Sequence, residues 1–281
     1  MSTFTKVLLA TDLTPQSDNL LGCLSCLCPD AETEVVLAHV LDDEDDADPH
    51  GSTYQNVRNH LAGYKTKLEA KGFESVEILT PVGDIDEVLN DIAEDSEVDL
   101  LMLASHGKGF FERTFKGSTT YDVAKTATIP LFIDRDDDND NSDELLGTVL
   151  VATDFSKQSL DALNIIRSLR EYVGRVIFLH VVEHSRSRED YRDKKAAAEM
   201  QLEELVDELK NFGIKADYKV TKGKASQKID EYCEKENVGM VIMARTGSGN
   251  TSELSLGGTA ENVVLNVDRA ILLLPAVDLD D

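Results

Sequence analysis

A doubly wound α/β fold that occurs twice in one chain is predicted by three features of this 281-residue sequence. The same apolar segments return in the same order about 140 residues later, which indicates a duplication. In each half, apolar strand segments alternate with longer helical patterns, which is typical of parallel βαβ units. An acidic stretch without core-forming residues separates the halves. We therefore expect two domains, over 1–135 and 147–281, joined by an acidic linker over 136–146.

The duplication rests on three matches that keep their order along the chain. Each match covers a strand and the first residues after it, and the spacing changes by one or two residues in the loops only. One short match would carry little weight, whereas three in order leave little room for chance. The matched segments are KVLLATD at 6–12 with TVLVATD at 148–154, LAHV at 37–40 with FLHV at 178–181, and DLLMLASHG at 99–107 with GMVIMARTG at 239–247.

The first three elements of each half are a strand, a helix and a second strand. Segments 7–10 and 149–152 are entirely apolar, as expected for strands with helices on both faces. Leucine and isoleucine then recur at helical spacing after Ser17 and Ser159, which predicts amphipathic helices. The second strands are expected at 35–40 and 176–182.

The later elements of each half follow the same alternation. Long amphipathic helices are expected around 57–70 and 191–210, and a third short strand ends at a glycine turn, Gly83 or Gly223. A helix then leads to the fourth strand, and a last helix ends near Thr128 or Asp268. The expected fourth strands are 100–104 and 240–244, and the fifth strands are 130–133 and 270–274.

Composition excludes several classes of protein. The chain has 54 acidic and 28 basic residues, a net charge of −26, which argues against binding to nucleic acid or to anionic membranes. No apolar run approaches the ~20 residues of a membrane span, and the first residues lack a signal-peptide layout. Four cysteines, three of them crowded together, do not form a disulfide framework for a chain of this length. We therefore expect a cytoplasmic protein.

Candidate ligand-binding residues follow the strands in both halves. Ligands of open parallel sheets bind beyond the carboxyl ends of the strands. The first strand of each half ends at an aspartate, Asp12 or Asp154, and the fourth is followed by two glycines separated by nine residues. The second glycine opens a helix, where unpaired N–H groups attract phosphate. A plain helix cap is the alternative for one such loop, but its occurrence twice favours phosphate binding.

This layout resembles the universal stress protein family in its tandem form, over essentially the whole chain. The family's nucleotide-binding members carry a signature of Gly, two residues, Gly, nine residues, Gly and then Ser or Thr. The resemblance implies a stress-response protein of adenine nucleotide alpha hydrolase-like fold, with five parallel strands in the order 3-2-1-4-5. It also implies ATP as ligand, with Mg²⁺ or Mn²⁺, and dimers or pseudo-dimers packed through the fifth strands.

By that resemblance, corresponding residues of the two domains hold the nucleotide. The aspartate approaches the ribose or adenine, a valine backbone reads the adenine edge, and the glycines and hydroxyls hold the phosphates. In the first domain these residues are Asp12, Val40, Leu103, Ala104, Gly107, Gly117, Ser118 and Thr119. In the second domain they are Asp154, Val181, Met243, Ala244, Gly247, Gly257, Gly258 and Thr259.

Three positions depart from the signature. Ala104 and Ala244 stand where its first glycine is expected, and Gly258 stands where a hydroxyl is expected. The loop of the first domain also carries more basic residues than acidic ones, whereas the loop of the second is balanced. We therefore expect ATP in the first domain before the second, and the absence of nucleotide from both stays an alternative.

Other polar groups have simpler interpretations. Cys23, Cys26 and Cys28 lie inside the first helix rather than at a strand-to-helix turn, so we expect one core cysteine and two partly exposed ones instead of a redox or metal site. His39 and His180 end the second strands, where a hydrogen-bonded structural histidine is favoured over a catalytic base. The acidic run at 42–48 lacks the pattern of a calcium loop and is expected to be solvated.

These observations favour a regulator that binds adenine nucleotide and acts through protein partners that the sequence does not identify. No catalytic or metal-ligating residue is predicted, and ATP hydrolysis is expected to be weak at most. One alternative is a slow ATPase, although a Walker A lysine motif is absent. The other is a scaffold whose two halves form a pseudo-symmetric interaction surface without ligand.

Overall fold

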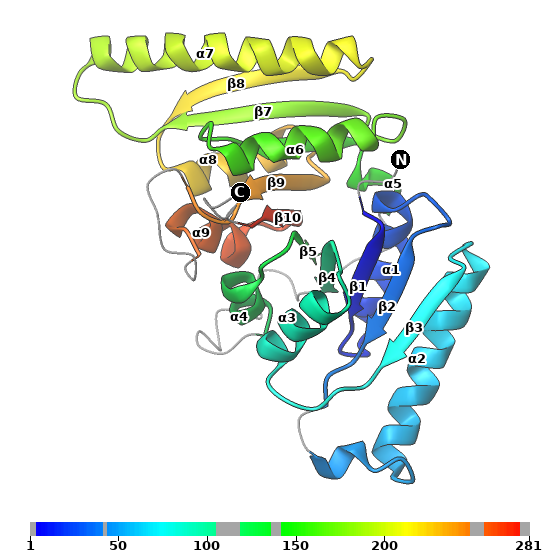
Figure 1. Cartoon of the computed structure of the whole chain (residues 1–281). Helices are drawn as coiled ribbons and strands as arrows, with labels where there is room; N and C mark the ends of the chain where they lie inside the picture. The colour runs from blue at the N-terminus through cyan, green and yellow to red at the C-terminus, as the bar shows by residue number, and fades with distance from the viewer. Residues whose placement is uncertain (1–3, 42–43, 105–118, 136–141, 248–255, 276–281) are drawn as a thin grey trace. The chain divides into compact units, whose positions relative to one another are not determined.

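The computed structural model describes residues 4–41, 44–104, 119–135, 142–247 and 256–275 (Figure 1). The chain divides into two compact units, Met1–Ser142 and Asp143–Asp281. Each unit contains five parallel strands connected by helices. The predicted fold class, a repeated doubly wound α/β domain, is confirmed.

In the first unit the strands pair in the order β3-β2-β1-β4-β5, as predicted. The central strand β1 is parallel to both of its neighbours, with Leu8 opposite Val36 of β2 and Leu101 of β4. The strands are β1 (Lys6–Ala10), β2 (Glu34–Ala38), β3 (Ser75–Leu79), β4 (Leu100–Ala104) and β5 (Leu131–Asp134). The helices are α1 (Pro15–Leu27), the short 3-10 helix η1 (Glu44–Ala47), α2 (Ser52–Ala70), α3 (Ile85–Asp95) and α4 (Thr119–Thr126).

The second unit repeats this order as β8-β7-β6-β9-β10. Its central strand is β6, where Leu150 lies opposite Ile177 of β7 and Val241 of β9. The strands are β6 (Thr148–Ala152), β7 (Arg175–Val182), β8 (Ala216–Lys222), β9 (Met240–Ala244) and β10 (Ala270–Leu274). The helices are α5 (Ser142–Leu145), α6 (Lys157–Ser168), α7 (Arg188–Asn211), α8 (Ala225–Lys235) and α9 (Gly258–Asn266).

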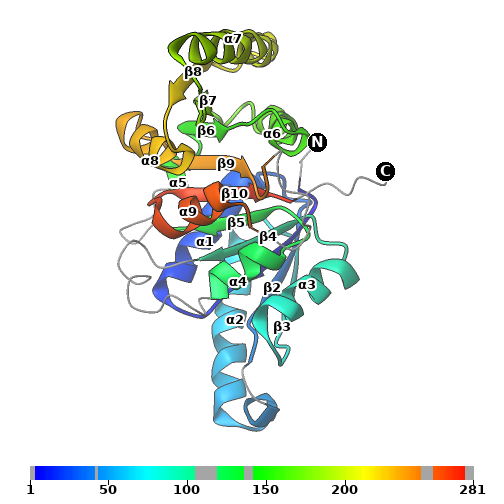
Figure 2. The same ribbon diagram turned by 90° about the vertical axis from the view of Figure 1, so that its left-hand side faces the viewer.

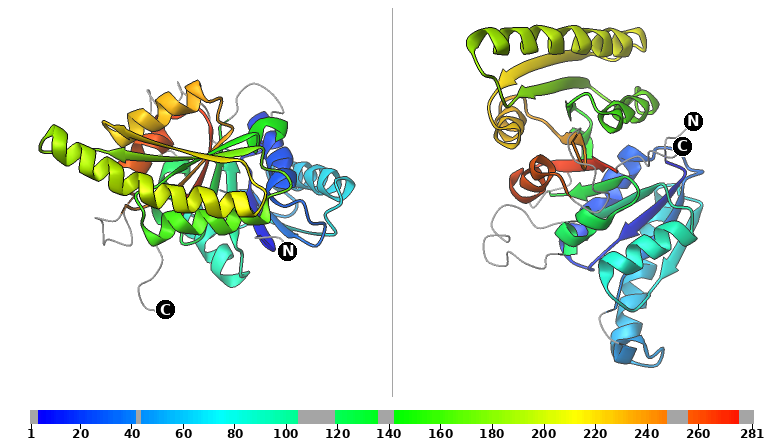
Figure 3. Two further views of the ribbon diagram at one scale, coloured as in Figure 1. Left: turned by 90° about the horizontal axis from the view of Figure 1, so that it is seen from above. Right: turned by 60° about the vertical axis from the view of Figure 1, so that its left-hand side comes forward.

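Helices cover both faces of each sheet. In the first unit α1 contacts α2, and α3 contacts α4, so each pair forms one layer (Figure 2). In the second unit α8 contacts α9, while α7 lies along β7 and β8 (Figure 3). The central residues Leu8 and Leu150 are completely buried, because water is excluded from both faces of the strands that carry them.

Three helices begin earlier than the apolar pattern predicts, because caps rather than apolar residues set their first turns. α1 starts at a proline, which is favoured there since its missing N–H has no helical partner at that position. Ser156 precedes α6 and its Oγ accepts a hydrogen bond from Ser159 N. Ser187 precedes α7 and accepts from Asp190 N at 3.0 Å.

The second strands differ in length between the units. β7 reaches Val182 as predicted, whereas β2 ends at Ala38, two residues earlier than predicted. In the second unit, pairing continues until Val182 lies opposite Lys222. The matching stretch of the first unit contains Pro81, which cannot donate a backbone hydrogen bond to a strand ladder. It accepts one instead, from Leu41 N to Pro81 O at 2.8 Å.

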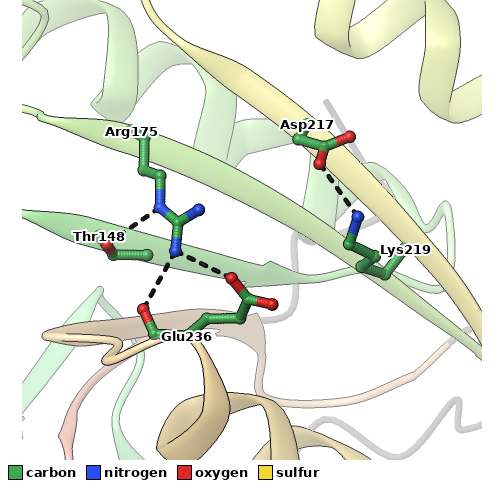
Figure 4. A network of polar contacts seen from close by, with 5 residues as sticks. All are labelled: Thr148, Arg175, Asp217, Lys219 and Glu236. Atoms are coloured by element: carbon green, nitrogen blue, oxygen red, sulfur yellow. Dashed lines mark hydrogen bonds and ion pairs between the residues drawn. The ribbon is translucent and has the colours of Figure 1, made fainter.

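Polar contacts connect the amino ends of the strands in the second unit (Figure 4). Arg175, at the start of β7, donates from Nε to Thr148 Oγ1 at 3.3 Å. Its Nη2 donates to the carbonyl and the carboxylate of Glu236, at 3.1 and 3.0 Å. This guanidinium therefore joins two strands to the end of α8, at the edge of the sheet opposite the predicted ligand residues.

The acidic connection between the halves ends inside the second unit. Residues 136–141 of the predicted linker lie outside the described part of the chain, and α5 follows them. Leu145 and Leu146 are buried, and Gly174 N donates to Leu146 O at 2.9 Å. A Cβ atom on Gly239 would contact the carbonyl oxygens of Glu144 and Leu145. Glycine thus lets the start of β9 lie directly against α5.

Among the described helices, none combines the length and the apolar character needed to cross a membrane.

We predict that Gly239→Ala lowers the free energy of unfolding by about 2 kcal/mol, because the added methyl group forces backbone apart at α5. Chemical denaturation of the full chain measures this change. Gly63→Ala is the control: Gly63 lies within helix α2, and a Cβ there would meet no atom within 4 Å. It should raise the same free energy by ~0.5–1 kcal/mol. Equal stability of the two variants would contradict the close approach at Gly239.

Candidate functional site

A cavity of about 400 Å³ lies at the carboxyl ends of β6, β7 and β9 in the second unit. Helices α8 and α9 begin at its edge, so backbone from three strands and two helices surrounds it. All eight residues that the sequence predicts for this unit line the cavity: Asp154, Val181, Met243, Ala244, Gly247, Gly257, Gly258 and Thr259. The structure thus brings together residues that lie as much as 105 positions apart in the sequence.

A sharp turn after β6 presents Asp154 to the cavity. Thr153 Oγ1 accepts a hydrogen bond from Phe155 N at 2.9 Å, and Asp154 Oδ1 accepts one from Ser156 N at 3.1 Å. Phe155 has a φ of 64°, a left-handed conformation that is uncommon for a non-glycine residue. A Cβ atom on Gly247 would lie 3.2 Å from Asp154 Oδ2, so this carboxylate borders the glycine loop.

The two strand-end histidines are hydrogen-bonded to the neighbouring strand in the same way. His180 Nδ1 lies 2.9 Å from Thr153 O, and His39 Nδ1 lies 2.7 Å from Thr11 O. A carbonyl can only accept, so Nδ1 donates in both cases. His180 also packs against the ring of Phe155, with 4.7 Å between centroids. This geometry agrees with the structural interpretation of these histidines.

Arg245, just after β9, and Gly257, just before α9, are hydrogen-bonded to each other. Arg245 N donates to Leu274 O of β10 at 2.8 Å, and Gly257 N donates to Arg245 O at 2.9 Å. A Cβ atom on Gly257 would lie 3.1 Å from that same Arg245 oxygen, so glycine permits the close approach. On Gly258, by contrast, a Cβ would meet no atom within 4 Å. The first N–H groups of α9 therefore begin at a position open to a ligand.

Ala244 does not close the cavity. This residue takes the place of the first glycine of the signature, and its methyl group forms part of the wall. The volume of about 400 Å³ remains with that methyl group in place, within the range of ~300–1,000 Å³ typical of small-molecule sites.

The cavity also contains residues that sequence reasoning missed. Glu183 lies at the mouth, where its Oε1 accepts a hydrogen bond from Ala225 N at 2.7 Å. Arg245 and Thr246 are buried in the wall, and burial lowers the pKa of the Arg245 guanidinium from its ordinary value. Arg245 and Thr246 could have been predicted because they stand between Ala244 and Gly247 in the sequence, whereas no sequence pattern indicated Glu183.

In the first unit, the structure describes the predicted site residues that follow or end the strands. Asp12 and Val40 follow β1 and β2, and Leu103 and Ala104 end β4. Thr119 is the first residue of α4. The other predicted residues lie outside the described part of the chain, and so do the basic residues on which the preference for this domain rests: Gly107, Lys108, Arg113, Lys116, Gly117 and Ser118.

Asp12 is hydrogen-bonded through Oδ1 to residues of its own loop and of the first turn of α1. Its Oδ1 accepts from Thr14 N at 3.0 Å, from Thr14 Oγ1 at 2.6 Å and from Ser17 Oγ at 2.8 Å. Nearby, burial and a hydrogen bond to Asp18 raise the pKa of the Tyr64 hydroxyl. The three hydrogen bonds to Oδ1 therefore fix the Asp12 carboxylate to its own loop and to the start of α1.

The cysteine run is part of the core of the first unit rather than a site. Cys23 and Cys28 are buried and Cys26 is half-buried. The expectation that Cys28 is partly exposed is wrong, because Cys28 N donates to Leu24 O at 2.8 Å, a helical i to i−4 bond that keeps Cys28 on the buried face of Leu20 and Leu24. Burial raises the pKa of the Cys28 thiol. Within the described residues, no group of three or more His, Cys, Asp or Glu side chains is arranged to hold a metal ion.

Comparisons with known proteins agree with this architecture. A sequence model of the universal stress protein family matches residues 3–135 and again 146–275. Universal stress protein MJ0577 of Methanocaldococcus jannaschii is 24% identical over 153 residues, covering 46% of this chain and 94% of that protein.

Solved structures share the fold along nearly the whole chain. A universal stress protein from Archaeoglobus fulgidus DSM 4304 aligns over 97% of both chains, with a TM-score of 0.72 and 22% identity. A functionally unknown protein, PA1789 from Pseudomonas aeruginosa PAO1, aligns over 98% of this chain and 93% of its own, with a TM-score of 0.67 and 14% identity.

We predict that a maleimide labels Cys26 of the native protein much faster than Cys23, Cys28 or Cys233. Buried thiols are out of reach of the reagent, and a raised pKa leaves little of the reactive thiolate at Cys28. Peptide mass spectrometry after timed labelling measures the rates, and labelling in denaturant provides the fully reactive reference. Comparable labelling of Cys28 and Cys26 in the native protein would show that the end of α1 is not packed as described.

Proposed function

The chain belongs to the universal stress protein family, and on this premise we propose that it binds an adenine nucleotide in at least one of its two domains. The observation that supports this proposal best is the cavity of the second unit, which is lined by all eight residues predicted for that domain. The eight residues come from three strands and the start of a helix, so a chance grouping around one cavity would be improbable.

The chemistry of the cavity suits the parts of a nucleotide. The Asp154 carboxylate accepts hydrogen bonds and so suits a ribose hydroxyl, while Val181 and Met243 offer apolar surface to a base. The start of α9, at Gly258 and Thr259, offers N–H groups and a hydroxyl to phosphates. ATP is the ligand that we expect.

A divalent cation fits this site as a companion of the nucleotide. Mg²⁺ usually keeps several waters and is held by substrate phosphates with one or two carboxylates. Asp154 and Glu183 are the carboxylates that line the cavity. When bound, the ion would neutralise part of the phosphate charge.

The proposed role is regulation linked to binding rather than turnover. A ligand shifts an equilibrium between two states only by its difference in affinity for them. A bound phosphate would favour one packing of the glycines that line the cavity, Gly247, Gly257 and Gly258. A cytoplasmic location and association through the fifth strands remain predictions from the resemblance.

The two domains differ in which feature favours binding, and one pair of variants distinguishes between them. The charges of the glycine loop favour the first domain, whereas the described cavity favours the second. We predict that Gly257→Val weakens Mg-ATP binding at least ~10-fold, because its side chain meets the Arg245 carbonyl and displaces the start of α9. Calorimetric titration measures the change, and thermal unfolding checks that the variant is folded.

The controls identify the domain that binds. Gly63→Ala adds a methyl group in open space within α2, at a residue that does not line the cavity, and should leave the affinity within about twofold of the original. Loss of binding in Gly117→Val with full binding in Gly257→Val would place the nucleotide in the first domain. Mass spectrometry of small molecules released from denatured protein gives an independent measure. No release and no binding heat over a wide range of salt would contradict nucleotide binding altogether.

We predict separately that Gly258→Ser strengthens ATP binding by about two- to tenfold. The substitution restores the hydroxyl that the signature has at this position, and the site has room for the added side chain. Titration of Gly258→Ser beside Gly258→Ala separates the hydroxyl from the methylene. An equal effect of both substitutions would show that the hydroxyl does not reach the phosphates.

A further inference from the structure

Lys224 connects the beginnings of the two helices that border the cavity. It is the residue before α8 and directly follows Gly223, whose φ is 146°. Its Nζ lies 3.3 Å from Asn262 Oδ1, and Asn262 Nδ2 donates to Gly258 O at 2.6 Å. The ammonium group therefore lies beside the first turn of α9.

This chain of contacts lies next to the cavity. Ala225, which follows Lys224, lines the cavity, and so does Gly258. The charged groups of the lining itself are the carboxylates of Asp154 and Glu183 and the buried guanidinium of Arg245. An exposed lysine at this rim adds a mobile cation near the N–H groups that we expect to meet phosphate.

Within the described part of the chain, the ammonium group of Lys224 forms no ion pair with a carboxylate. It donates to the neutral amide of Asn262, whereas Lys228 lies against Glu231 and Lys219 against Asp217. The side chain forms no capping bond with α8. Lys224 thus has no evident role in holding the helix, and a ligand phosphate would be a stronger partner than an amide oxygen.

The first unit has the opposite charge at the matching positions. Gly83, with a φ of 140°, is followed by Asp84 before α3, just as Gly223 is followed by Lys224 before α8. Asp122 stands three residues after Thr119, as Asn262 stands three after Thr259. The first unit therefore has two acidic residues where the second has a lysine and an amide. This difference in charge lies outside the glycine loops.

We propose that Lys224 is the residue by which the second domain favours phosphorylated adenine nucleotides over adenosine. This inference rests on the proposed function, and it adds a phosphate-binding cation supplied by the β8–α8 turn rather than by the glycine segment. The lysine exchanges the Asn262 oxygen for a phosphate oxygen when the nucleotide enters.

The test compares ATP with adenosine, which lacks the phosphates. Lys224→Met keeps the length of the side chain and removes its charge, without removing a cap. In the full chain carrying Gly117→Val, which restricts binding to the second domain, we expect Lys224→Met to weaken ATP binding about three- to tenfold. The affinity for adenosine should not change. Calorimetry or ligand competition at two salt concentrations measures both, and the effect on ATP should shrink at the higher one.

Two matched variants show whether charge at this place is responsible. Lys235→Met removes the same charge from the far end of α8 and should change neither affinity. Lys224→Arg keeps the charge and should retain most of the ATP affinity. Unchanged ATP binding in Lys224→Met would overturn the proposal, and so would equal losses for ATP and adenosine, which would indicate an effect through α8. If the parent chain binds neither ligand, nucleotide binding by the second domain fails as well.

Discussion

The parallel pairing of β6 with β7 on one side and β9 on the other is the constraint on which the cavity depends. Because parallel strands run the same way, their carboxyl ends reach one edge of the sheet together. That edge receives Asp154 from β6, Val181 from β7 and Met243 from β9, although these residues are far apart in the chain. The pairing of the apolar strands therefore determines which strand-end residues meet at the cavity.

The repeated Thr-Asp pair has a structural duty besides any contact with a ligand. In each unit the residue after it is left-handed, Leu13 at 62° and Phe155 at 64°, a conformation that costs a non-glycine residue about 1–2 kcal/mol. Each threonine hydroxyl accepts a hydrogen bond from that residue's N–H, which offsets part of the cost. Survival of the pair in both halves is thus explained by the turn as well as by the ligand, and by itself it does not show that both halves bind.

Much of the fold could be predicted from the sequence, because apolar runs and helical spacing are both local patterns. Apolar runs identify the strands and helical spacing identifies the helices, and duplication provides a second reading of each. The errors have separate causes: Pro81 shortens β2, whereas Cys28 is buried because it continues the helical spacing of Leu20 and Leu24. At the site, residues next to a motif were predictable, whereas Glu183 and Lys224 were not. Glu183 follows β7 and Lys224 follows β8, so the lengths of these strands place them near the cavity, and no motif specifies those lengths.

The contact of Gly239 with α5 has a consequence for how such a chain is divided. The repeat pattern alone would separate the halves at 147, one residue before the first matching segment of the second half. The carbonyls of Glu144 and Leu145 and the side chain of Leu146 nevertheless belong to the packing of the second unit. A fragment cut at the repeat boundary would expose the start of β9 to water, so the evolutionary module and the folding module differ by one helical turn.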